Sequence, residues 1–152
     1  MLKPNKNMIK LPRPNYYQGI LQLRNVNEEV LNFVRNQVEK RDGVFITKTV
    51  KLDNGVDLYI TSQYFIRILG KKLKESFGGE LKISSKLHTR SRTGKDLYRI
   101  NALFRPVPFK RGDIVVVRGD EVKLLAVGRR IFARDLKTGK RIRVRSSDLR
   151  KE

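Results

Sequence analysis

Histidine and cysteine, two side chains typical of acid–base and nucleophilic catalysis, are scarce in this sequence. His88 is its single histidine, and cysteine is absent. A catalytic base must lie within hydrogen-bond reach of the proton that it removes, and no nucleophile–histidine–acid set can be assigned around His88. A lone histidine just before a basic loop is more often a surface residue than a base. We therefore predict that the protein is not an enzyme.

Acidic pairs and glycine–lysine pairs provide no better case for a metal or cofactor. Asp53 and Asp57 bracket a predicted hairpin turn and Asp120-Glu121 forms another, so turn chemistry explains both pairs. A phosphate-binding P-loop requires the pattern G-x-x-x-x-G-K-[ST]. The Gly-Lys pairs at 70–71, 94–95 and 139–140 lack its upstream glycine and its final Ser or Thr. We expect no metal, no cofactor and no small-molecule substrate.

Cations recur in patterns that suit phosphate binding. Arg141, Arg143 and Arg145 alternate with Ile142 and Val144, so a strand here would project three arginines from one face at ~6.5–7 Å intervals. That interval is close to the phosphate repeat of a nucleic-acid strand. On a strand face that is merely solvated, positive and negative side chains would normally alternate. Here Asp135 and Asp148 are the only acidic residues among these cations. The same side is predicted to include Arg129, Arg130, Arg134, Lys137 and Lys140.

Three further groups of cations are candidate RNA contacts. Arg90, Arg92 and Lys95 crowd a predicted hairpin loop whose hydroxyl side chains also suit phosphate oxygens, although a solvated loop is the alternative. Lys71, Lys72 and Lys74 lie near the end of a predicted helix, and Lys3, Lys6, Lys10 and Arg13 lie in a proline-rich arm that is either a disordered tail or a segment following RNA. Tyr59 and Tyr98 either stack on bases or pack in the sheet, so we expect recognition of RNA shape and phosphates.

The overall charge points to a polyanionic partner. The chain has 35 Lys+Arg against 15 Asp+Glu, a formal charge of +20 in 152 residues. Lysine and arginine gain free energy by releasing the cations condensed on phosphates. A membrane surface would favour an amphipathic helix carrying Trp, Phe and Leu, but Trp is absent and no apolar run approaches a spanning length. The proline-broken N-terminal stretch also lacks the apolar core of a secretory signal, and the absence of cysteine is compatible with a reducing compartment.

Hydrophobic periodicity predicts the elements that carry these residues. Alternating patterns predict strands at 16–24, 44–52, 56–60, 81–87 and 97–105. Helical spacing predicts two helices, one capped by Asn27 and ending before Gly43, the other capped by Ser62 and ending at Gly78-Gly79. Asp53-Asn54-Gly55 is expected to supply left-handed positions for a tight turn. The order β-α-β-β-α-β-β predicts an α+β domain with two helices on one sheet face and the other face free to bind.

The remaining residues have an all-β pattern. Short strands are expected at 113–118, 122–127, 131–135 and 141–145, joined by glycine-containing turns as in small barrels. Pro106-Val107-Pro108 marks a junction, because proline interrupts strand pairing. We therefore expect a basic extended arm at 1–15, an α+β domain at 16–107 and a small SH3-like, KOW-like β-barrel at 108–152. A barrel this small would dock on the first domain or on RNA.

Two long blocks of the sequence resemble a known family. DNGVDLYITSQYFIRILGKKLKESFGGELKISSKL and TGKDLYRINALFRPVPFKRGDIVVV are similar to archaeal members of the NMD-three family, the export adaptors of the large ribosomal subunit. The resemblance extends from about Tyr17 to Asp148. It implies a domain similar in fold to a small eukaryotic large-subunit ribosomal protein, followed by a barrel like the first domain of a factor that binds the ribosomal E site. KRGDIVVVRG also resembles a KOW-type strand.

The resemblance implies an rRNA-binding protein of the large subunit, cytoplasmic and ribosome-associated, with rRNA and neighbouring ribosomal proteins as partners. Family members carry a zinc module of Cys-x-x-Cys pairs, a second barrel and a leucine-rich export tail, none of which this sequence contains. The chain is then either an excised piece or a shortened relative, and either a structural subunit or a biogenesis factor. A protein-interaction adaptor and a DNA-binding chromatin protein are the alternatives.

Overall fold

The computed structural model describes residues 14–90, 92–94 and 96–149, which form two α-helices and two β-sheets. The first part comprises β1 (Gly19–Arg24), α1 (Glu28–Lys40), β2 (Ile46–Leu52), β3 (Gly55–Ile60), α2 (Gln63–Phe77), β4 (Gly79–Arg90) and β5 (Asp96–Pro106). The second comprises β6 (Ile114–Val117), β7 (Asp120–Ala126), β8 (Ile131–Asp135), β9 (Arg141–Val144) and a short 3-10 helix (Ser146–Asp148). The predicted α+β class is confirmed.

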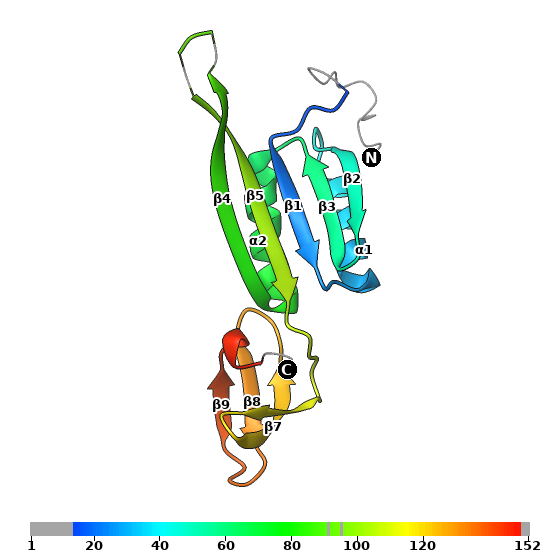
Figure 1. The fold of residues 1–152 in the computed structure, drawn as a ribbon. Coiled ribbons are helices and arrows are strands. Elements are labelled where there is room, and N and C mark those ends of the chain that lie inside the picture. The colour runs from blue at the N-terminus through cyan, green and yellow to red at the C-terminus, as the bar shows by residue number, and fades with distance from the viewer. Residues whose placement is uncertain (1–13, 91, 95, 150–152) are drawn as a thin grey trace.

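The first sheet has five strands in the order β2-β3-β1-β5-β4, and both helices cover one of its faces (Figure 1). β1 pairs antiparallel with β3 and parallel with β5. Leu21, Ile60 and Phe104 point from these strands into a core that also contains Val34 of α1 and Leu69 of α2. No helix of the described residues covers the opposite face of the sheet (Figure 1), and the side chains at its centre are partly exposed.

Both helices begin at the residues that the sequence predicts. The side chain of Asn27 accepts a hydrogen bond from the backbone N–H of Val30 at 3.0 Å, and that of Ser62 accepts one from Phe65 at 3.1 Å. Each bond satisfies a donor that the helix itself leaves without a partner. α2 ends where Gly78 adopts a φ of 70°.

The turn between β2 and β3 differs from its prediction. Neither Asp53 nor Asn54 has a positive φ, so this turn does not use the left-handed region. Gly55 is required for another reason, because a Cβ there would overlap the carbonyl oxygen of Leu23 in β1. The predicted left-handed turn is therefore wrong, and the glycine instead permits close approach of two strands.

The β4–β5 hairpin is longer than the pattern predicts and projects past both helices (Figure 1). Leu81 and Ile83 pack against the core, whereas Leu87, on the same alternation, is exposed. His88 lies at an irregularity in the pairing, between Leu87 and Thr89. The hairpin thus continues as a two-stranded ribbon beyond the packed part of the sheet.

The second sheet has four strands in the order β6-β7-β8-β9, and within the described chain no pairing joins β6 to β9. These strands therefore form an open sheet and not a closed barrel, and the SH3-like form of the expected barrel stays a prediction. The core of this sheet is covered by Val107 and Phe109 before β6 and by Leu149 after the 3-10 helix, instead of by further strand pairing. β6 and β7 are joined by Arg118-Gly119, both at positive φ as in a type I′ turn.

Two backbone hydrogen bonds connect the second part of the chain to the end of α2. The N–H of Val107 donates to the carbonyl of Gly78, and the N–H of Arg129 donates to that of Glu75, each at 3.2 Å. Each sheet has its own cluster of buried residues. The domain boundaries at 15–16 and 107–108 stay predictions.

Candidate nucleic-acid interface

The outer face of the second sheet carries a row of three cations on neighbouring strands. Lys123 in β7 is opposite Arg134 in β8, and Arg134 is opposite Arg141 in β9. Opposed residues in antiparallel pairs have Cβ atoms ~4.5–5.5 Å apart. All three side chains are exposed, because the alternate residues of each strand fill the core. The row can therefore present three positive charges to one anionic surface.

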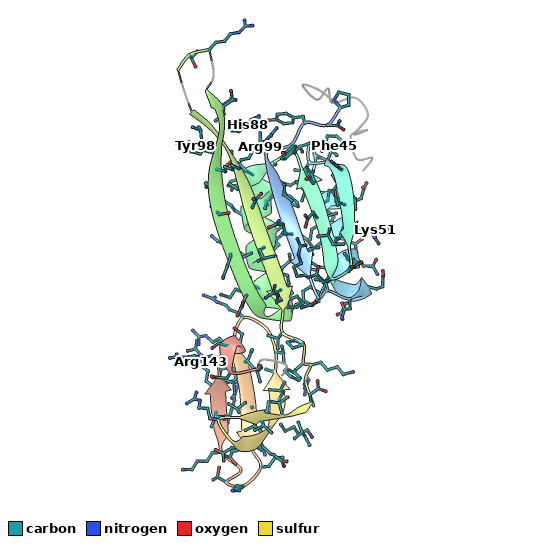
Figure 2. The ribbon with its side chains drawn as sticks, in the orientation of Figure 1. Phe45, Lys51, His88, Tyr98, Arg99 and Arg143 are labelled. Atoms are coloured by element: carbon teal, nitrogen blue, oxygen red, sulfur yellow. The ribbon has the colours of Figure 1, made fainter. Side chains whose placement is uncertain are left out.

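Arg143 extends this row along β9, where it lies opposite Phe132 (Figure 2). The guanidinium of Arg141 lies 4.3 Å from the centroid of the Phe132 ring, within the range of a cation–π contact. Contact with the ring restrains Arg141 without occupying its N–H groups. We call Lys123, Arg134, Arg141 and Arg143 the basic sheet face.

Throughout the described ranges, no carboxylate forms an ion pair with a member of the basic sheet face. Glu121 shares the outer side of β7 by strand alternation but forms no such pair. Arg118, in contrast, lies 3.4 Å from the carboxylate of Asp148. Like charges on adjacent strands repel one another, and an anionic ligand would relieve that repulsion.

Arg145 falls one residue beyond the strand that contains the other two predicted arginines. β9 ends at Val144, and Arg145 precedes the 3-10 helix, where its backbone N–H donates to Asp148 at 3.3 Å. β9 itself therefore contributes Arg141 and Arg143.

The structure brings two other predicted groups to the end of α2. Arg129 and Arg130 are exposed in the β7–β8 loop, which the Arg129–Glu75 backbone hydrogen bond holds beside that helix. The helix carries three exposed lysines, of which Lys72 donates to the side chain of Gln37 at 3.1 Å. These lysines are Lys71, Lys72 and Lys74. Lys137 and Lys140 are exposed in the turn between β8 and β9.

The remaining predicted contacts lie at or beyond the limits of the described residues. Arg92 is exposed in the loop that follows β4, and Arg90 is the last residue of that strand. The side chain of Arg90 lies outside the described part of the structure. Five other predicted contacts also lie outside the described residues, namely Lys3, Lys6, Lys10, Arg13 and Lys95.

The uncovered face of the first sheet carries an array of cations and aromatic rings that the sequence did not reveal. The guanidinium of Arg99 lies 3.8 Å from the Tyr17 ring centroid, and it donates to the carbonyl and hydroxyl oxygens of Tyr17 at 3.2 and 3.1 Å. The Tyr17 ring meets Tyr59 edge to face at 4.7 Å, and the ammonium of Lys48 lies 5.2 Å from the Tyr59 centroid. Tyr59 is thus half-buried and packed, while Tyr98 is exposed.

Lys123 and the Arg99–Tyr17 contact were not predicted, and they differ in the sequence signal that could have revealed them. Lys123 lies between the inward-facing Val122 and Leu124, so the alternation that predicts β7 also places Lys123 outside. The contact of Arg99 with Tyr17 spans 82 residues and depends on the parallel pairing of β1 with β5. Periodicity within a single strand contains no information on that pairing.

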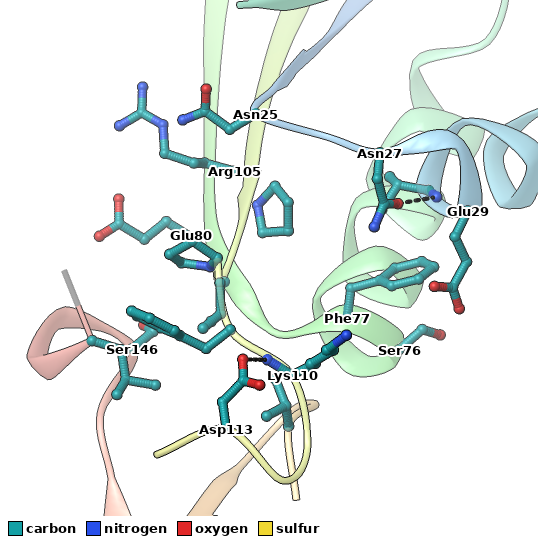
Figure 3. A pocket seen from close by; sticks show the side chains of 18 of the residues that line it. Asn25, Asn27, Glu29, Ser76, Phe77, Glu80, Arg105, Lys110, Asp113 and Ser146 are labelled. Carbon is teal, nitrogen blue, oxygen red and sulfur yellow. Dashed lines mark hydrogen bonds between the residues drawn. The ribbon is translucent and has the colours of Figure 1, made fainter. Parts of the chain in front are cut away.

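A pocket of about 1210 Å³ lies at the junction of the two sheets (Figure 3). Phe77 of α2 and Phe109 form apolar parts of its wall, and the backbone N–H of Lys110 donates to Asp113 at 2.9 Å inside it. Cations and carboxylates are mixed along the lining, so it favours neither sign of ligand. No cluster of three or more histidine, aspartate or glutamate side chains suited to a metal occurs among the described residues.

Fold and surface together define a small α+β protein with a cationic sheet face. A family model described as "NMD3, second domain" matches residues 16–105, more than half of the chain. The chain belongs to the NMD3 family, whose members are associated with the large ribosomal subunit, its export and its biogenesis. No curated protein matches the chain. An archaeal source and a shortened form stay predictions.

Neither helix of the described chain is long and apolar enough to cross a membrane.

Proposed function

We propose that this chain is a non-enzymatic protein that binds ribosomal RNA of the large subunit, as a structural subunit or biogenesis factor of cytoplasmic ribosomes. The observation that carries the proposal is the basic sheet face, four cations on three adjacent strands without paired carboxylates. Membership of the NMD3 family favours ribosomal RNA among the possible polyanions.

The geometry supports binding through phosphates. Arginine presents N–H donors in a fixed fork that matches two phosphate oxygens, and Phe132 restrains the guanidinium of Arg141 before any ligand arrives. Contacts of this kind fix position and supply affinity through counterion release, but they do not read sequence. Specificity for folded RNA would then come from the spacing of cations over the whole surface.

Replacing two members of the basic sheet face tests this proposal. With Arg141→Gln and Arg143→Gln together, we expect the slope of log affinity against log salt to become shallower by roughly 1.4 to 1.8, about 0.7 to 0.9 for each phosphate that is no longer neutralised. The measurement is filter binding of a large-subunit rRNA fragment over a series of salt concentrations.

The matched control removes the same charge from elsewhere. Arg35 and Arg67 are exposed on α1 and α2, and Arg35→Gln with Arg67→Gln should leave the slope close to that of the parent protein. Equal slopes for the two double variants would contradict a localised interface. Equal affinity for duplex DNA would favour a chromatin protein, and weak binding to both nucleic acids would favour a protein-interaction adaptor.

Sedimentation separates the two ribosomal roles. A structural subunit should remain with polysomes after a high-salt wash of cell extract, whereas a biogenesis factor should leave and sediment with free large subunits or their precursors. Detection at the top of the gradient alone would contradict both roles.

A further inference from the structure

Large apolar side chains are exposed at the end of the first sheet where the β4–β5 hairpin projects past the helices. Leu87, Tyr98 and Tyr64 are 52%, 48% and 66% exposed. Leu87 and Tyr98 are directly opposed across the hairpin, and Tyr64 lies in the first turn of α2. We call the opposed pair Leu87 and Tyr98 the hairpin platform. Contiguous exposed apolar surface commonly marks a binding site.

The lengths of the elements explain why this surface is uncovered. The N–H of Gln63, the first residue of α2, donates to the side-chain oxygen of Gln18. The backbone carbonyl of Gln18 accepts a hydrogen bond from the N–H of Ile100. α2 therefore starts at the level of Ile100, which is fully buried. Tyr98 lies on the same face of β5, two residues further toward the hairpin loop, and so extends past the start of the helix (Figure 2).

The charge around the platform indicates an anionic partner. Lys86 and Arg99 are opposed on the other face of the hairpin, and Arg92 is exposed in its loop. The sequence from 86 to 99 contains five Lys or Arg residues, and Asp96 is its single acid. An aromatic and aliphatic surface on a cationic hairpin combines the two properties that an unpaired nucleotide requires, a face for its base and positive charge for its phosphates.

We propose that the hairpin platform binds an unpaired nucleobase of RNA, stacked on the ring of Tyr98 beside Leu87, with a flanking phosphate near Arg92 in the hairpin loop. This inference rests on the proposed function, and it adds a second class of contact to it. The basic sheet face binds phosphates in any RNA, whereas the platform distinguishes RNA that contains an accessible base from RNA that is fully paired.

The test compares two RNAs of the same stem sequence, one closed by an unpaired loop containing 2-aminopurine and the other a continuous duplex. The parent protein should quench the fluorescence of the loop base and prefer the loop RNA. Tyr98→Leu removes the ring but keeps an apolar side chain, and it should weaken loop binding roughly 5-fold or more, within the range of stacking on one aromatic residue. Its affinity for the duplex should stay unchanged.

Tyr98→Phe is the matched control, because it retains the ring and should retain both the preference and the quenching. Since Tyr98 is half exposed, each variant should unfold at the temperature of the parent protein. Unchanged loop affinity and quenching in Tyr98→Leu would overturn the platform, as would an equal loss for loop and duplex. In either case a salt slope that still depends on Arg141 and Arg143 would leave the proposed function standing, whereas a parent protein that binds neither RNA would overturn both.

Discussion

Gly55 sets the spacing of two strands through its lack of a side chain. A Cβ at this position would overlap the backbone carbonyl of Leu23, and a backbone atom within a sheet cannot move aside easily. We expect Gly55→Ala to reduce the free energy of unfolding by about 3 kcal/mol or more, in the range of severe packing substitutions. Urea denaturation measures the change.

Gly139→Ala provides the comparison, because Gly139 has a φ of 71° but open space around it. Only the cost of a left-handed alanine applies there, about 1 kcal/mol. A loss at Gly55→Ala no larger than that at Gly139→Ala would show that the two strands can move apart around the new Cβ, and it would contradict the close approach to Leu23 as the reason for the glycine.

Individual residues were predictable from the sequence where their role is local. Asn27 and Ser62 cap helices through bonds that span three residues, and such contacts depend only on neighbouring positions. The role of Gly55 was not predictable, since the atom that excludes a side chain belongs to another strand. The same holds for Tyr17, whose partner Arg99 is remote in the chain.

At the scale of the elements, α1 depends on its first turn. Its apolar face is buried through Val30, Val34 and Val38, but its N-terminal donors rely on the side chain of Asn27. Asn27→Ala should cost about 1 kcal/mol of stability, the usual value of an N-cap. Asn36→Ala, at an exposed position within α1, should be neutral or slightly stabilising because alanine favours helix. Thermal unfolding followed by circular dichroism checks both, and equal effects would contradict a capping role.

The elements themselves followed from periodicity, but their arrangement did not. Strands and helices appear close to the predicted ranges because alternation and helical spacing reflect which face is buried. The parallel neighbours β1 and β5 are separated by the rest of the first part of the chain, so no local pattern specifies their pairing. Whether the last strands close into a barrel was not predictable for a related reason, since short strands with glycine turns also fit the open sheet that is observed.

At the scale of the whole molecule, the junction of the two sheets depends on close backbone contact. A Cβ at Gly128 would lie 3.0 Å from the carbonyl oxygen of Glu75, the same oxygen that accepts the hydrogen bond from Arg129. Larger residues at 128 would therefore compete with that bond. Prolines in the sequence mark 106–108 as a junction, but no local pattern indicates that the β7–β8 loop returns to α2.

Gly128→Ala should therefore loosen the junction while leaving both cores folded. Losing a backbone hydrogen bond worth ~0.5–1.5 kcal/mol should speed amide hydrogen exchange at Arg129 roughly 2- to 10-fold. The amides of β1 and β5 lie in the larger core and should keep their protection. Gly112→Ala, where φ is 93° but a Cβ meets open space, carries the cost of a left-handed alanine and should leave the exchange of the Arg129 amide unchanged. Hydrogen exchange followed by NMR is the measurement. An Arg129 amide that is as protected in Gly128→Ala as in the parent protein would contradict a junction held by this backbone contact, because the second sheet would then keep its place without it.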